Sequence, residues 1–153
     1  MMRNGIFMKA RHYLLQALQG VDSSCILYFE LCVAIGKNFH EQKNTDQAIS
    51  FYVKSLKSLQ NLDKRNQTLE ILLALGEVLL NKESLPLASM FFENALILAT
   101  ELRGCDHRYT ADALHGLAKS IMNQNEILSI SLFKECKFLQ FEQLYPYGSF
   151  FQI

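Results

Sequence analysis

A spacing pattern that recurs about every 40 residues constrains the fold of this chain most. A small residue is followed four positions later by a large one, and three positions after that by a second small residue, as in Ala48, Tyr52 and Ser55. Residues at these steps share one side of a helix, where they form a knob between two hollows that a neighbouring helix can fill. Further copies are Ala88, Phe92 and Ala95, then Ser129, Phe133 and Cys136, and an isolated copy with leucine at Ala10, Leu14 and Ala17.

A second pattern precedes three of these copies. An apolar residue is followed at once by a small one in the pairs Ile35-Gly36, Leu75-Gly76 and Leu117-Ala118. A glycine inside a helix costs about 1 kcal/mol relative to alanine. Two glycines at equivalent positions therefore indicate that a second helix approaches closely. A large apolar residue follows each small one after three positions, namely Phe39, Leu79 and Ile121.

Helix start signals divide the chain into seven segments. Each segment carries apolar residues at steps of three and four, and the short connections between segments require antiparallel neighbours. We therefore predict an all-α chain of about seven helices. The signals are Asp22-Ser23-Ser24, Thr45-Asp46, Asp63, Ser84 with Pro86, Asp106 and Asn125, and the segments are 3–19, 23–41, 45–60, 64–82, 85–102, 107–123 and 126–140.

The overall charge excludes several classes of partner. The 153 residues carry 15 basic and 15 acidic side chains, so no net field attracts nucleic acid or an anionic membrane. The longest apolar stretch, Ile71 to Leu80, is interrupted by Glu77 and is only half the ~20 residues of a membrane span. We expect one soluble domain with no nucleic-acid partner and no membrane span.

Residues 29 to about 140 resemble the tetratricopeptide repeat, with half a repeat before them. The small-aromatic-small triplets and the apolar-small pairs stand where that family has its signature residues. The longer period and the stretch Gly104-Cys105-Asp106-His107-Arg108 are similar to the kinesin light chain subtype, although Arg108 stands where that subtype usually has proline. The resemblance implies an α-solenoid wound as a right-handed superhelix, with a lone helix at 3–19 and repeats at about 23–60, 64–102 and 107–140. It also implies a non-enzymatic scaffold or adaptor that binds another protein.

The residue types that carry chemistry do not form an evident site. None of the histidines His12, His40, His107 and His115 is followed by a second ligand four residues later, so no metal and no cofactor is expected. The four cysteines, at 25, 32, 105 and 136, fit neither a zinc site nor a disulfide framework. We expect reduced thiols in a cytoplasmic protein. The first 21 residues contain no acid, which leaves targeting to an organelle as the alternative.

In a stack of such repeats, the first helix of each pair lines a concave groove, and the resemblance implies that a peptide or a helix binds there. Two glutamates, Glu70 and Glu77, lie near the middle, which disfavours a terminal carboxylate as ligand and favours basic or apolar side chains. The alternatives are a solvated face without a ligand, a subunit of a larger permanent assembly, and a fragment of a longer repeat protein. By register the groove residues are Glu30, Val33, Lys37, His40, Glu70, Leu73, Glu77, Leu80, Asp112, His115, Lys119 and Met122.

The final segment, 141–153, is predicted to be an aromatic tail. A free tail of this composition would be adhesive, so something should cover it. It either folds back onto the third repeat or docks into a partner or a second copy of the chain. The large apolar residues in and just before it are Leu139, Phe141, Leu144, Tyr145, Tyr147, Phe150, Phe151 and Ile153.

Overall fold

The computed structural model describes residues 2–60, 62–102, 107–122 and 125–144. These residues form seven helices and no strand, which confirms the predicted all-α fold. The helices are α1 (Met2–Gln19), α2 (Ile26–Glu41), α3 (Thr45–Ser58), α4 (Arg65–Asn81), α5 (Leu85–Glu101), α6 (His107–Ile121) and α7 (Glu126–Leu144).

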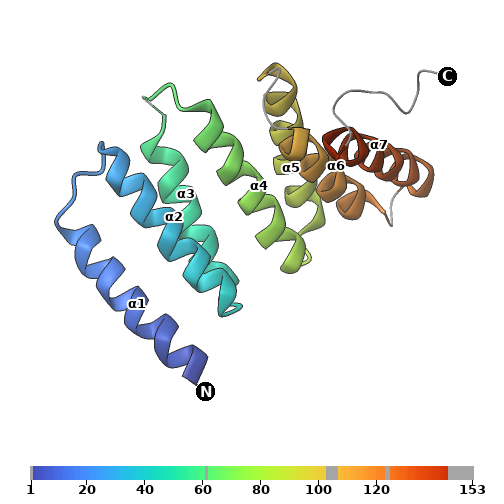
Figure 1. The fold of residues 1–153 in the computed structure, drawn as a ribbon. Coiled ribbons are helices and arrows are strands. Elements are labelled where there is room, and N and C mark those ends of the chain that lie inside the picture. Colours follow the sequence, from blue (N-terminus) through green and yellow to red (C-terminus); the bar gives the residue numbers. More distant parts are fainter. Residues whose placement is uncertain (1, 61, 103–106, 123–124, 145–153) are drawn as a thin grey trace.

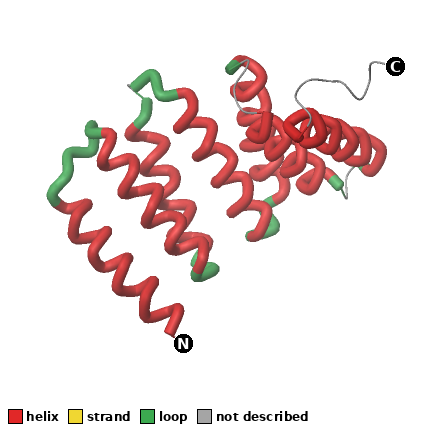
Figure 2. The backbone as a smooth tube through the Cα atoms, in the orientation of Figure 1, coloured by secondary structure: helices red, strands yellow, loops and turns green. Residues whose placement is uncertain are grey.

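The helices form a single row in which each packs on the next. Figure 1 shows α1 at one end of the row and α7 at the other, and Figure 2 shows short loops between α2 and α3 and between α4 and α5. The pairs α2–α3, α4–α5 and α6–α7 pack together, and the contacts of α3 with α4 and of α5 with α6 join successive pairs. The chain is therefore a solenoid of antiparallel helix pairs, preceded by α1, which packs on α2.

The period of 40 residues is also present in the backbone of the loops within the pairs. Lys43 and Glu83 both adopt the left-handed conformation, with φ of 60° and 64°. The next residue in each loop donates its N–H back to the end of the preceding helix, from Asn44 to Phe39 O at 2.9 Å and from Ser84 to Leu79 O at 3.0 Å. These bonds end α2 and α4 in the same way and set the same reversal of direction.

The start of α2 differs from the prediction. The helix begins at Ile26 rather than at residue 23, because Asp22 closes a turn instead of capping the helix. Its carboxylate accepts the N–H of Ser24 at 3.1 Å, and its carbonyl accepts the N–H of Cys25 at 3.0 Å. Asn125, by contrast, caps α7 as predicted, since its side-chain oxygen accepts the N–H of Leu128 at 3.1 Å.

The repeated small residues bring each helix pair together. A Cβ atom added at Gly36 would lie 2.8 Å from the ring of Tyr52, and one added at Gly76 would lie 2.8 Å from the ring of Phe92. In the third pair the hydroxyl of Ser129 donates to the carbonyl of Ala118 at 3.0 Å. In the first two pairs the glycine of the first helix thus lies against the aromatic residue of the second helix, and in the third pair Ala118 meets Ser129.

Helix α7 runs to Leu144, four residues into the segment predicted to be a tail. The rest of that tail, 145–153, lies outside the described residues, as do the linker residues Gly104, Cys105 and Asp106. Over the part of the chain that the structure describes, none of the helices has the length and hydropathy of a membrane span.

Candidate protein-interaction groove

A hollow of about 310 Å³ lies where α2, α4 and α6 come together. Six of the residues predicted from the register line it, and all of them project from the first helices of the pairs. The prediction had not included four further lining residues. The predicted set is Val33, Lys37, Glu70, Leu73, Glu77 and Asp112, and the additional residues are Ile71, Ala74, Arg108 and Tyr109.

A smaller hollow of about 80 Å³ continues the first one between α4 and α6. Glu77 and Asp112 belong to both hollows, so the two form one groove across the three repeats. Of the predicted residues, Leu80, His115 and Lys119 also line this end. Its remaining lining residues, Phe92 and Gly116, come from the packing contact between α5 and α6.

Three predicted residues, Glu30, His40 and Met122, line neither hollow. Glu30 and Met122 are exposed near opposite ends of the row. The Nε2 atom of His40 lies 3.2 Å from Nδ2 of Asn81, a contact between the ends of α2 and α4. Their register is that of groove residues, but they lie beyond the hollowed part of the surface.

A hydrogen bond crosses the groove between α6 and α4. The hydroxyl of Tyr109 donates to Oε1 of Glu70 at 2.9 Å. Burial, followed by this bond, raises the pKa of Tyr109 above its usual value, so the phenol keeps its proton. Glu70 and Glu77 are both exposed; Glu70 helps to position α6, whereas Glu77 lies where the two hollows meet.

The charges in the groove are of both signs. Three carboxylates, from Glu70, Glu77 and Asp112, lie among the basic groups of Lys37, Lys119 and Arg108. The imidazole of His115 adds no charge near neutral pH, because burial and then the charge of Lys119 lower its pKa.

The sequence contained a signal for one of the residues that the prediction omitted. Arg108 occupies the position where the related repeats usually have proline, and its guanidinium lies 5.2 Å from the centre of the Tyr109 ring. Both residues are in the first turn of α6 and reach the hollow beside α4. The departure from the motif thus brings a cation and a phenol into the groove.

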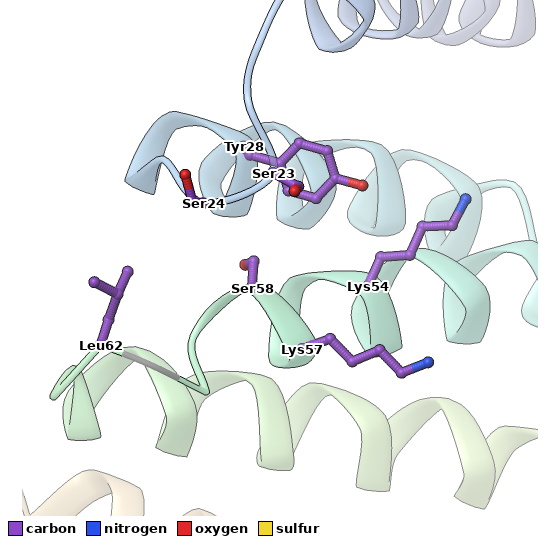
Figure 3. Close-up of a pocket in the computed structure, with 7 residues that line it drawn as sticks. All are labelled: Ser23, Ser24, Tyr28, Lys54, Lys57, Ser58 and Leu62. Atoms are coloured by element: carbon purple, nitrogen blue, oxygen red, sulfur yellow. The ribbon is translucent and has the colours of Figure 1, made fainter.

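A separate hollow of about 390 Å³ lies at the edge of the solenoid, where α2 begins and α3 ends. Figure 3 shows the ammonium groups of Lys54 and Lys57 and the hydroxyl of Tyr28 extending toward the same side of this hollow. Although it is larger than either part of the groove, it belongs to one repeat, and its lysines are exposed. We therefore regard the groove, which uses equivalent positions of three repeats, as the better candidate. The other residues that line the edge hollow are Ser23, Ser24, Ser58 and Leu62.

The described residues hold no group of three histidines, cysteines or carboxylates that could bind a metal ion. Cys32 and Cys136 are buried free thiols, and burial raises the pKa of both. They are protonated at neutral pH and are poor nucleophiles. Cys25 is free and exposed, while Cys105, which the sequence places near His107, lies outside the described residues.

No protein-family model and no curated protein matches this sequence. Solved structures do match it. BtubC (BKLC) from P. vanneervenii shares 15% identity with a TM-score of 0.83, over 91% of this chain and 58% of BtubC. A putative kinesin light chain of Podosopora anserina with nearly identical TPR-like repeats shares 12% identity with a TM-score of 0.75, over 92% of this chain and 70% of the other; a point variant of that protein gives the same identity and TM-score. The chain spans less than two thirds of BtubC. The TM-scores of these matches show that this chain has the helical repeat fold of the tetratricopeptide-like, kinesin-light-chain-like proteins.

Proposed function

We propose that this protein is a non-enzymatic scaffold that binds a peptide or a helix of another protein in the groove formed by α2, α4 and α6. The observation that carries the proposal is the continuity of the groove: two hollows share Glu77 and Asp112 and collect side chains from three repeats. A solvated face without a ligand does not require such a concave, partly apolar surface. We place this activity in the cytoplasm, in keeping with the reduced thiols of Cys32 and Cys136.

The side chains of the groove favour a ligand that is basic at its centre and apolar beside it. Glu77 is exposed where the two hollows meet, and the half-buried Ala74 and Leu80 supply apolar surface on the same helix, whereas Leu73 is buried in the core. A lysine or arginine of the ligand would pair with Glu77, and neighbouring apolar side chains would lie against Ala74 and Leu80. A terminal carboxylate would meet Glu77 and Asp112 and be repelled.

A role as a subunit of a permanent assembly is the second candidate, and one observation favours it. The surface carries large exposed apolar side chains at both ends of the row, among them Ile6 and Tyr13 in α1 and Ile127 in α7. Permanent subunits bury such residues against partners. A protein that stays monomeric and dispersed without a partner would favour the scaffold, and one that aggregates alone would favour the subunit.

Binding of synthetic peptides tests the groove directly. We would measure fluorescence anisotropy with two labelled peptides of equal length, one with lysines among leucines and one with glutamates at the same positions. Glu77→Lys should weaken binding of the basic peptide at least tenfold, since it replaces an attraction with a repulsion. The matched control is Glu93→Lys, which reverses an exposed charge on α5 outside the groove and should leave binding unchanged.

Amide chemical shifts would then locate the bound peptide. The proposal requires that the shifted amides belong to α2, α4 and α6. Equal binding by the parent and Glu77→Lys, or shifts confined to α3 and α5, would place the ligand elsewhere.

A further inference from the structure

One side of α1 lacks the helix contacts that the same sequence pattern makes in α3 and α5. The triplets Ala48, Tyr52, Ser55 in α3 and Ala88, Phe92, Ala95 in α5 are buried against the preceding helices, α2 and α4. Ala10 and Ala17, the small residues of the α1 triplet, are exposed. Helix α1 therefore has the sequence of a second helix of a pair, whereas no first helix of the described residues covers it.

The exposed residues form one stripe. Ile6, Ala10, Tyr13 and Ala17 are spaced by four, three and four residues, so they share one side of the helix. Ile6 is 67% exposed and Tyr13 is 69% exposed. We call these four residues the outer face of α1.

The opposite side of α1 is anchored to α2, which keeps the outer face turned away from the rest of the protein. The guanidinium of Arg11 donates to Oε1 of Gln42 at 2.7 Å and lies 4.6 Å from the centre of the Phe39 ring. The amide of Asn38 donates to the carbonyl of Phe7 at 3.0 Å. Turning the outer face inward would break all three contacts.

The charges beside the outer face identify the kind of helix that would cover it. Helix α1 contains no acidic residue. Arg3 lies one turn before Ile6, and Lys9 lies one turn before Tyr13, so a cation borders each edge of the stripe. Both are exposed. A second copy of α1 would bring like charges together, whereas a helix with carboxylates along its edges would be attracted.

We infer that the outer face of α1 is a docking site for an acidic amphipathic helix of a partner protein, which would pack on α1 as α2 packs on α3. The interface continues the arrangement within the solenoid, where α2 and α4 cover the same positions of α3 and α5. Small residues at Ala10 and Ala17 leave hollows for the partner, and Ile6 and Tyr13 would insert between its side chains. The site is separate from the groove, which lies on α2, α4 and α6.

A labelled synthetic helix with the sequence of α4, residues 65–81, is a suitable probe because α4 is itself a first helix. Its five exposed positions, Arg65, Asn66, Glu70, Glu77 and Asn81, would all be glutamate in an acidic probe and all be lysine in a basic probe. Both probes keep the same buried face. At low salt the full-length protein should bind the acidic probe at least tenfold more tightly than the basic one.

Three variants of the protein test the location. Ile6→Ser and Tyr13→Ser should each weaken the acidic probe at least fivefold. Met8→Ser is the matched control, because Met8 is 58% exposed on the same helix but outside the outer face, and it should bind as the parent does. Glu77→Lys, in the groove, should also leave this affinity unchanged, which separates this site from the proposed peptide site.

The inference is overturned if the acidic and basic probes bind equally, if neither binds, or if Met8→Ser weakens binding as much as Tyr13→Ser. Light scattering of the protein without a probe tests whether the protein dimerises. A dimer that Tyr13→Ser dissociates would show that a second copy covers the outer face and that the partner helix is wrong.

Discussion

Phe92 of α5 is enclosed between a glycine of α4 and a glycine of α6, and this contact offers a sensitive test of the packing. A Cβ atom added at Gly76 would lie 2.8 Å from Cε1 and Cζ of the ring. One added at Gly116 would lie 2.5 Å from Cδ1 and closer to the other two ring carbons. The ring is 2% exposed, so it has no room to swing into solvent. The overlap is relieved only if α4 or α6 moves away from α5.

The expected cost follows from two opposing effects. Replacing a helical glycine with a residue that has a side chain contributes up to about 1 kcal/mol of stability. Overpacking a well-filled core costs about 1–3 kcal/mol, and more when several carbons are added. We expect Gly76→Leu to lower the free energy of unfolding by about 2–3 kcal/mol, equivalent to roughly 5–10 °C in Tm at this chain length. Gly116→Ala should cost about 1–2 kcal/mol, because its single added carbon meets the same ring at a shorter distance.

Urea unfolding followed by circular dichroism measures these values, and the chain provides its own control. Gly5 lies inside α1 with nothing within 4 Å of an added Cβ, so Gly5→Leu should not destabilise the protein. Combining Gly76→Leu with Phe92→Leu should cost less than the sum of the two single changes, since the smaller side chain makes room. If Gly76→Leu unfolds at the same urea concentration as the parent, the contact between α4 and α5 is wrong.

Three further predictions concern other parts of the fold. Glu83→Gly should raise the free energy of unfolding by about 0.5–1 kcal/mol in urea, because glycine adopts positive φ without steric cost; a loss would mean that the Glu83 side chain is needed in the loop. Burial, and then the charges of Glu77 and Glu41, raise the pKa of Tyr52 to about 12 from the value of 10.0 expected in an unfolded chain. Its contribution to stability is therefore full below pH 10 and is lost as the pH rises from 10 to 12, roughly 2–3 kcal/mol, and Tyr52→Phe should make the melting temperature less sensitive to pH over that range. Asn38→Ala removes the hydrogen bond to Phe7 and should speed hydrogen exchange of the α1 amides about tenfold relative to α4; unchanged exchange would show that the other contacts hold α1.

The order, type and pairing of the helices could be predicted from the sequence because their signals are local. The apolar periodicity defines each helix, and the small residues at Gly36 and Gly76 meet aromatic residues 16 positions later, within the same pair. The same register located most of the groove, since Lys37, Glu77 and Lys119 occupy equivalent exposed positions on the first helices. The start of α2 was predicted wrongly because an aspartate carboxylate can accept a backbone N–H either at the start of a helix or within a turn. Asp22 accepts the N–H of Ser24 in a turn.

Contacts between repeats were decided only by the tertiary structure. The bond from Tyr109 to Glu70 and the approach of Gly116 to Phe92 both join one repeat to the previous one. Their geometry depends on the angle between successive pairs, which arises from the packing of many side chains and has no short sequence signature. The exposure of the outer face of α1 is likewise decided by the tertiary structure. The sequence by itself determined that Ala10, Leu14 and Ala17 form a second-helix pattern, and only the arrangement of the helices left two of them exposed, because no first helix of the described residues lies against them.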